Sequence, residues 1–199
     1  MLLERLQQST TEDDHFRWLL FVVGYYRGAQ RIDAAKGLLQ QFLRGSEKSE
    51  YKVHCHLALG QIATDEQELE TALNHFNAAL ALKPGSKKVE YVLLNNTGYC
   101  LNMLARYEEG ERLCRKALEI DWARASAYRN LGVSLHGQGD LIGCAWALVE
   151  AAKADASDGR ARVLLEKLLA SNPTLVISNP WIMEALNPAS AKAVETACI

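Results

Sequence analysis

A repeating pattern of apolar and small residues organises the chain between Val53 and Ser157. Apolar positions there follow the spacing of one helix face, and short polar or glycine-containing stretches separate the runs. A glycine is followed after twelve residues by a small residue, after four more by a packing residue and after three more by alanine. The three sets are Gly60, Ala72, Phe76 and Ala79; Gly98, Gly110, Cys114 and Ala117; and Gly132, Cys144, Leu148 and Ala151. Because successive glycines are 38 and 34 residues apart, the pattern predicts paired helices that stack on their neighbours.

The pattern divides residues 53–158 into three helical hairpins, at 53–86, 91–124 and 125–158. Pro84 and Gly85 end the first hairpin, because proline cannot continue a helix and glycine tolerates the reversal. Small residues are needed at Gly98 and Gly132, where two helix backbones are expected to approach closely.

Weaker signals flank the three hairpins. We expect a polar lead-in over 1–14, a divergent helical hairpin over 15–50 and a capping helix over 159–171. The tail, 172–199, contains three of the four prolines. In the tail, Leu175–Ile177 predicts an extended segment and Pro180 predicts a short helix over Trp181–Leu186, while 189–199 is left open between a weak helix and a frayed end.

The spacing of these residues resembles that of a known repeat family. The first hairpin carries Leu59-Gly60, Ala72, Phe76, Ala79 and Pro84, and the third carries Tyr128, Leu131-Gly132, Gly139 and Ala151. This arrangement resembles the tetratricopeptide repeat, although the second hairpin departs from it with Thr97 before its glycine and Trp122 where proline is usual. The resemblance implies an all-α, right-handed superhelix of tetratricopeptide-type helical hairpins with a C-terminal capping helix.

Composition and charge narrow the classes of function. The net charge is −2 with no dense block of lysine or arginine, so a nucleic-acid partner is not expected. The most apolar window, Trp18–Tyr26, has nine residues, and Met1–Arg5 lacks the features of a signal peptide, so membrane insertion is not expected. The five cysteines are odd in number and never spaced as CxxC, which predicts reduced thiols in a cytoplasmic protein.

The sequence offers little chemistry for catalysis. His54, Cys55 and His56 are adjacent, and neighbouring helical residues point about 100° apart, so the three cannot converge on one metal ion. No glycine-rich phosphate loop, GxSxG elbow or HExxH motif occurs in the chain. We therefore predict no catalytic residues, no metal site and no cofactor, and a protein that is not an enzyme.

The family resemblance implies a concave groove lined by the first helix of each hairpin, which binds an extended peptide or a helix. Register places these groove positions at His54, Leu57 and Gln61; at Asn95, Asn96, Tyr99 and Asn102; and at Arg129, Asn130, Val133 and His136. Asparagine suits this role because its amide both donates to and accepts from a peptide backbone. A solvated polar surface is the alternative interpretation. A carboxylate clamp is not expected, because Leu57 and Ser126 stand where the family's clamp has lysines.

An apolar stripe marks the outward, convex face of the third hairpin. Ile142, Trp146 and Val149 occupy positions that are polar or charged in the two preceding hairpins. An apolar stripe on an outward helix face predicts a cover, which is either the chain's own tail or a partner such as a second copy. We favour the tail, because a tethered segment loses less entropy than a free partner.

These observations favour a non-catalytic scaffold or adaptor that binds a peptide or helix of a partner protein. A bacterial secretion-type chaperone that holds a secreted client is the first alternative, since the resemblance extends to chaperones built from three such repeats. Self-assembly through the apolar stripe, as a homodimer, is the second.

Overall fold

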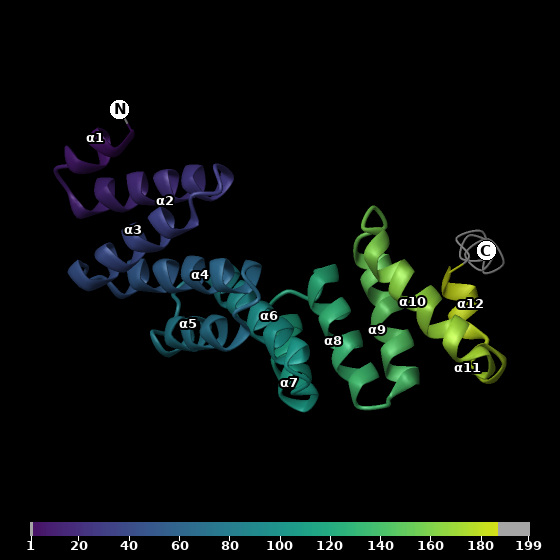
Figure 1. Cartoon of the computed structure of the whole chain (residues 1–199). Helices are drawn as coiled ribbons and strands as arrows, with labels where there is room; N and C mark the ends of the chain where they lie inside the picture. The colour runs from purple at the N-terminus through teal and green to yellow at the C-terminus, as the bar shows by residue number, and fades with distance from the viewer. Residues whose placement is uncertain (1, 187–199) are drawn as a thin grey trace, which may run out of the picture. The chain divides into compact units, whose positions relative to one another are not determined.

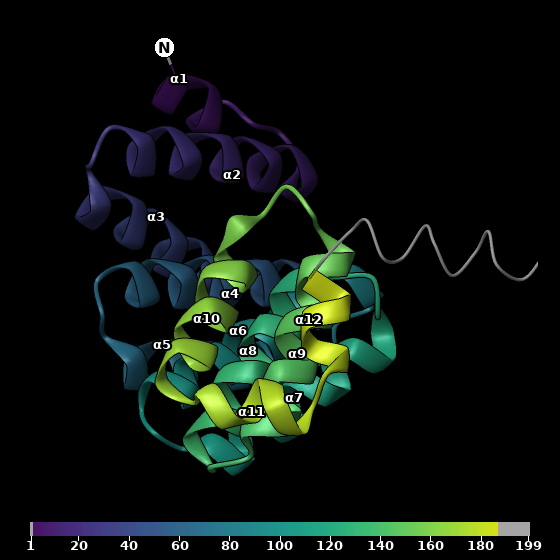
Figure 2. The same ribbon diagram turned by 90° about the vertical axis from the view of Figure 1, so that its right-hand side faces the viewer.

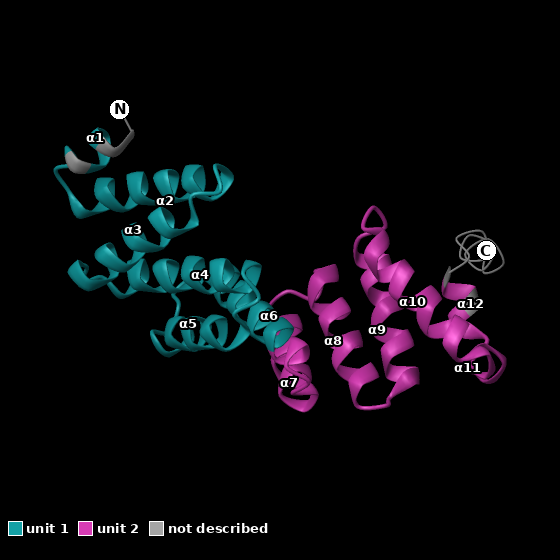
Figure 3. Cartoon of the chain, in the orientation of Figure 1, with its two compact units in different colours: residues 1–100 teal, residues 101–199 magenta. Residues whose placement is uncertain are grey.

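The computed structural model describes residues 2–186. That range consists of helices joined by short turns and contains no strand (Figure 1). The helices are α1 (Leu2–Gln7), α2 (Glu12–Gly28), α3 (Ile32–Gly45), α4 (Ser49–Asp65), α5 (Leu69–Ala81), α6 (Lys87–Met103), α7 (Tyr107–Ile120), α8 (Ala125–Gly137), α9 (Leu141–Ala154), α10 (Gly159–Ser171), α11 (Pro173–Ser178) and α12 (Trp181–Leu186). The predicted all-α fold is confirmed. The chain consists of two compact units, and the boundary between them lies between Cys100 and Leu101, within α6 (Figure 3).

The first unit is a series of antiparallel helix pairs. In it, α3 packs against both α2 and α4, and α4 packs against α5. A single apolar cluster joins α1 to α4 and includes Leu19 and Leu39, which are 1% and 0% exposed. Helix α2 begins where the Thr11 hydroxyl accepts a hydrogen bond from the Asp14 N–H at 3.1 Å, which satisfies one of the free donors of the first turn.

Residues 1–14 differ from the expected polar lead-in. Helix α1 occupies part of this segment, and α2 has already begun at Glu12. Leu6 is 4% exposed and belongs to the same apolar cluster as Leu19. The reason is that packing against a neighbour can stabilise so short a helix, whereas its six residues are too few to give a periodic signal in the sequence.

The second unit continues the pairing. Helix α8 packs against α7 and α9, and α10 and α12 both pack against α9 (Figure 2). Its largest apolar cluster includes Leu131 of α8, Leu148 of α9 and Leu165 of α10, all at most 2% exposed. Aspartates begin two of these helices: Asp140 accepts from the Gly143 N–H at 2.8 Å, and Asp158 accepts from the Arg160 N–H at 3.1 Å.

Glycine leaves room for a packing side chain where a hairpin's two helices meet. A Cβ atom on Gly60 would lie 2.4 Å from the Phe76 ring, and one on Gly132 would lie 3.1 Å from the Leu148 side chain. The close approach predicted at Gly132 is therefore present, but in both hairpins the nearest atoms belong to a packing side chain rather than to the facing backbone.

The tail is helical as far as the structure describes it. Leu175–Ile177, expected to be extended, lies within α11, because Pro173 takes the first helical position, where its missing N–H costs nothing. The short helix predicted over Trp181–Leu186 is confirmed as α12. The prediction for 189–199 falls outside the described residues.

Candidate functional site

The groove positions in the first unit lie on α4 and α6, and all of them are half-buried. These are His54, Leu57, Gln61, Asn95, Asn96 and Tyr99. The His54 ring centroid lies 5.8 Å from that of Phe16, and His54 lines a small cavity of about 180 Å³ beside the turn at 82–86. On α6, the Asn95 amide donates to the Asn96 side-chain oxygen at 3.4 Å, a long hydrogen bond that a stronger acceptor could replace.

Asn102 does not have the groove role that the sequence predicted for it. It is 5% exposed, its amide donates to the Asn130 carbonyl at 2.7 Å, and its carbonyl accepts from the Ser134 hydroxyl at 2.7 Å. These bonds join the end of α6 to α8. Asn102 therefore holds two helices together rather than presenting its amide to a peptide.

Arg129 is also engaged within the fold. It forms an ion pair with Asp158, and the two side chains are 14% and 12% exposed. Arg160 donates two further hydrogen bonds to Asp158, at 2.7 and 2.8 Å, and these bonds lower the pKa of the Asp158 carboxyl to about 2. Because Asp158 also caps the start of α10, Arg129 connects α8 to the start of α10.

Two further groove positions of α8, Val133 and His136, lie at an apolar pocket between α8, α9 and α10, whereas Asn130 is not part of its lining. Its volume is about 330 Å³. The lining consists of Gly132, Val133 and His136 of α8, Cys144 and Leu148 of α9, and Leu164, Lys167, Leu168 and Ser171 of α10. This lining contains two basic side chains and no carboxylate. We call it the α8–α10 pocket.

The sequence analysis did not predict that α10 contributes to the α8–α10 pocket. Leu164 is 36% exposed, and its neighbour Val163 is 48% exposed. The signal was present, since five apolar residues between 163 and 169 are more than one helix face can bury.

The apolar stripe on α9 is divided by the tail. Val149 is 3% exposed and shares a buried cluster with Ile182 of α12, which is 0% exposed. Ile142 and Trp146 remain 52% and 41% exposed, and the Trp146 ring meets Tyr128 edge-on at 5.9 Å. The cover over this face therefore reaches only part of the stripe.

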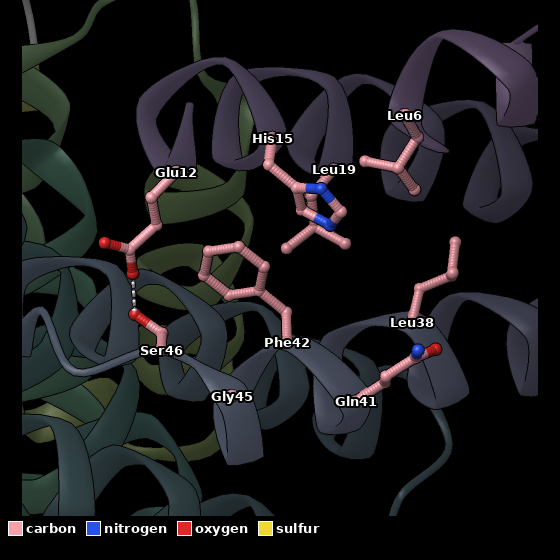
Figure 4. A pocket seen from close by; sticks show the side chains of 9 residues that line it. All are labelled: Leu6, Glu12, His15, Leu19, Leu38, Gln41, Phe42, Gly45 and Ser46. Carbon is pink, nitrogen blue, oxygen red and sulfur yellow. Dashed lines mark hydrogen bonds between the residues drawn. The ribbon is translucent and has the colours of Figure 1, made fainter. Parts of the chain in front are cut away.

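A second cavity lies in the first unit, between α1, α2 and α3, and we call it the N-terminal pocket (Figure 4). Its volume is about 360 Å³. Leu6, Leu19, Leu38 and Phe42 form its apolar walls, and Glu12, His15, Gln41, Gly45 and Ser46 complete the lining. No pattern in the sequence indicated this site, because its residues come from segments that the repeat register does not connect.

Several features that would support catalysis or metal binding are missing from the described residues. No group of three or more His, Cys, Asp or Glu side chains in 2–186 could hold a metal ion. Burial raises the pKa of the Cys55, Cys114 and Cys144 thiols to about 12, so none of the three is a thiolate at neutral pH. Among the same residues, no helix combines the length and apolar character needed to cross a bilayer.

Two histidines form a contact between α4 and α5. The Nδ1 atoms of His56 and His75 lie 3.1 Å apart, and neutral rings satisfy this contact when one nitrogen donates and the other accepts. Desolvation lowers the pKa of both imidazoles, and the charges of His75 and Lys52 lower that of His56 further.

The pair predicts a loss of stability in mild acid. Because the folded-state pKa is depressed, its contribution is complete above the ordinary histidine value of 6.5 and is lost as the pH falls through the folded-state pKa. The contact is one part-buried hydrogen bond, so the expected loss is about 1 kcal/mol. Urea unfolding between about pH 7 and pH 5 measures it, in the range where histidine titrates.

The control separates this pair from other titrating groups. In a His56→Gln/His75→Gln variant, the free energy of unfolding should depend less steeply on pH. His136→Gln, at an exposed position, should retain the wild-type slope of unfolding free energy against pH. Equal slopes in all three proteins would show that the pair does not sense pH.

Two of three comparisons with known proteins agree with the repeat pattern. The third found nothing, since no family model matches the chain. An uncharacterized TPR repeat-containing protein of Arabidopsis thaliana is 29% identical over 114 residues, which covers 53% of this chain. The matched part is only 14% of that relative's length, so the chain corresponds to a small section of it.

Solved structures share the fold at low sequence identity. MamA from Desulfovibrio magneticus superposes with a TM-score of 0.65 at 17% identity, covering 85% of this chain and 94% of that one. The Hsp90 co-chaperone Cns1 from Saccharomyces cerevisiae gives 0.62 at 15%, with 77% and 49% covered. A chain of the APC/C Cut9–Hcn1 assembly gives 0.68 at 20%, with 77% and 30% covered. By its fold and by the register of its repeats, this chain is similar to tetratricopeptide repeat proteins.

Proposed function

We propose that the chain is a non-catalytic protein-interaction scaffold that anchors a peptide or helix of a partner in the α8–α10 pocket. One observation carries the proposal: Val133 and His136, two predicted groove positions, line an apolar cavity of about 330 Å³. The similarity in fold to a co-chaperone and to a chain of a multi-protein assembly supports the same class of function. The location in the cytoplasm stays a prediction.

The lining indicates the kind of segment that fits. Leu148, Leu164 and Leu168 offer an apolar floor for one branched or aromatic side chain. His136 and Lys167 stand beside that floor without a carboxylate in the lining, so an acidic residue next to the anchor would add a favourable interaction. Binding of a peptide that is disordered when free loses chain entropy, and micromolar affinity is therefore expected.

A charge placed in the pocket tests the proposal. Peptides are selected from a display library on the wild-type protein, synthesised and titrated by calorimetry against Val133→Glu. We expect at least a tenfold loss of affinity, about 1.4 kcal/mol or more, because the new carboxylate would be desolvated by the bound anchor.

The matched control is Ala170→Glu, which adds the same side chain at an exposed position of α10 outside the pocket. It should bind as the wild type does, and circular dichroism should show both variants folded. Selected peptides that bind Val133→Glu with unchanged affinity would remove the pocket as the anchor site.

Self-association is a second candidate, favoured by the exposure of Ile142 and Trp146. Both side chains lie on α9 beside the part of the stripe that α12 covers. A second copy that buried them would extend an apolar contact already present within one chain.

A further inference from the structure

The N-terminal pocket offers a hydrogen-bond acceptor that the fold leaves unused. The Ser9 hydroxyl has one proton and lies 2.7 Å from the Leu6 carbonyl, which can only accept it. The same oxygen lies 2.9 Å from His15 Nδ1, so in this arrangement the Nδ1–H donates to Ser9. A neutral His15 held in this tautomer has an unprotonated Nε2, and no described residue donates a hydrogen bond to it.

The His15 ring is fixed in place and reaches into the pocket. It stacks on Phe42 with centroids 5.5 Å apart and an interplanar angle of 19°. Figure 4 shows the ring projecting from α2 into the space that Leu6, Leu38 and Phe42 surround. A ligand donor placed there would meet an oriented lone pair at no cost of ordering the histidine.

Glu12 adds a second acceptor to the pocket lining, which also contains the polar side chains of Gln41 and Ser46. One oxygen of Glu12 accepts from the Ser46 hydroxyl at 2.6 Å, and the second lies 3.9 Å from Lys48 Nζ, too far for a hydrogen bond. The carboxylate repels an anionic ligand, while Leu6 and Leu19, both at most 4% exposed, provide apolar contact within the same pocket.

We propose that the N-terminal pocket binds a small, uncharged apolar molecule that carries one N–H or O–H donor, with the donor directed at His15 Nε2. A cavity of about 360 Å³ is at the lower end of the range for small-molecule sites, which excludes a large cofactor. Indole is the simplest probe of this class, and 1-methylindole is its matched control because it keeps the apolar body and lacks the donor. This site is separate from the proposed peptide anchor and does not depend on it.

The first experiment compares the two probes on the unaltered full chain. Indole and 1-methylindole are titrated by nuclear magnetic resonance, and long-range proton–nitrogen spectra follow the His15 ring nitrogens. We expect saturable binding of indole, a shift of the Nε2 resonance and at least fivefold weaker binding of 1-methylindole. Equal affinity for the two probes, or no saturable binding of indole at its solubility limit, would overturn the proposal.

Variants then localise the site. His15→Phe keeps a ring against Phe42 but removes the acceptor. It should therefore lower the affinity for indole at least fivefold and leave the affinity for 1-methylindole unchanged. Leu38→Trp should fill the cavity and abolish binding of both probes. Asn74→Ala, at an exposed position of α5, should bind as the wild type does. An indole affinity that neither pocket variant changes would place the ligand elsewhere and contradict the proposal.

Discussion

Replacing Phe76 with alanine is expected to lower the free energy of unfolding by about 4 kcal/mol, the largest effect of any single truncation in the first unit. Phe76 is 0% exposed, and its ring fills the space above Gly60 in the hairpin of α4 and α5. The substitution removes the buried ring and leaves a cavity that the two helices cannot close without shifting. Urea unfolding followed by circular dichroism measures the change.

Gly60→Ala should destabilise the same hairpin by overpacking it rather than by leaving a cavity. Its Cβ would lie 2.4 Å from the Phe76 ring, a distance at which the ring or the helix must move. Overpacking of this kind costs about 2 kcal/mol and outweighs the gain of about 1 kcal/mol that alanine brings to a helix interior. The net expected loss is therefore about 1 kcal/mol or more.

The two changes together test whether they act through one contact. In the Phe76→Ala background the space above Gly60 is empty, so Gly60→Ala should become neutral or stabilising, and the two effects should fail to add. Gly24→Ala is the matched control, because a Cβ there meets nothing within 4 Å, and it should stabilise α2 by about 0.5–1 kcal/mol. If the losses of unfolding free energy at Gly60 and Phe76 are additive, the Phe76 ring is not the reason that glycine is favoured at position 60.

This hairpin also shows why the fold could be predicted from the sequence. The glycine, the aromatic residue and the alanine recur at fixed spacings because each hairpin solves the same packing problem with its own neighbours. Such local periodicity survives in the sequence even when the residue type changes, as from Phe76 to Leu148. The all-α class and the helix pairs followed from this register.

The candidate site could be predicted only in part, because register gives the direction of a side chain and not its partner. Asn102 and Arg129 occupy groove positions, yet a serine hydroxyl, a backbone carbonyl and Asp158 engage them within the fold. Val133 and His136 do line a pocket, but α10 completes it with Lys167, and no repeat position marks that helix. Long-range contacts of this kind depend on how successive helices pack, which one sequence does not record.

The second large effect is expected at the tail, where Ile182→Asp should detach α12 from α9. Ile182 is 0% exposed and lies in the apolar cluster that contains Val149 and Leu165. Burial of an unpaired carboxylate there would cost several kcal/mol. Because α12 has only six residues, release of this helix is a cheaper response than burial of the charge.

Release of α12 should then change the assembly state. Val149 would join Ile142 and Trp146, already 52% and 41% exposed, in one continuous apolar stripe. Size exclusion coupled to light scattering should show a higher mass for Ile182→Asp than for the wild type at micromolar concentration. Glu184→Ala, at an exposed position of the same helix, should leave the mass unchanged.

A second charge distinguishes the stripe from other causes of association. Ile182→Asp/Trp146→Asp should return to the mass of the wild type, because two copies cannot bury a charged stripe against each other. If the double variant still associates, the tail covers a different surface from the one that the sequence indicated. If Ile182→Asp keeps the wild-type mass while its α12 is shown to be detached by proteolysis, the stripe needs no cover. The apolar residues of α9 would then be available to a different partner.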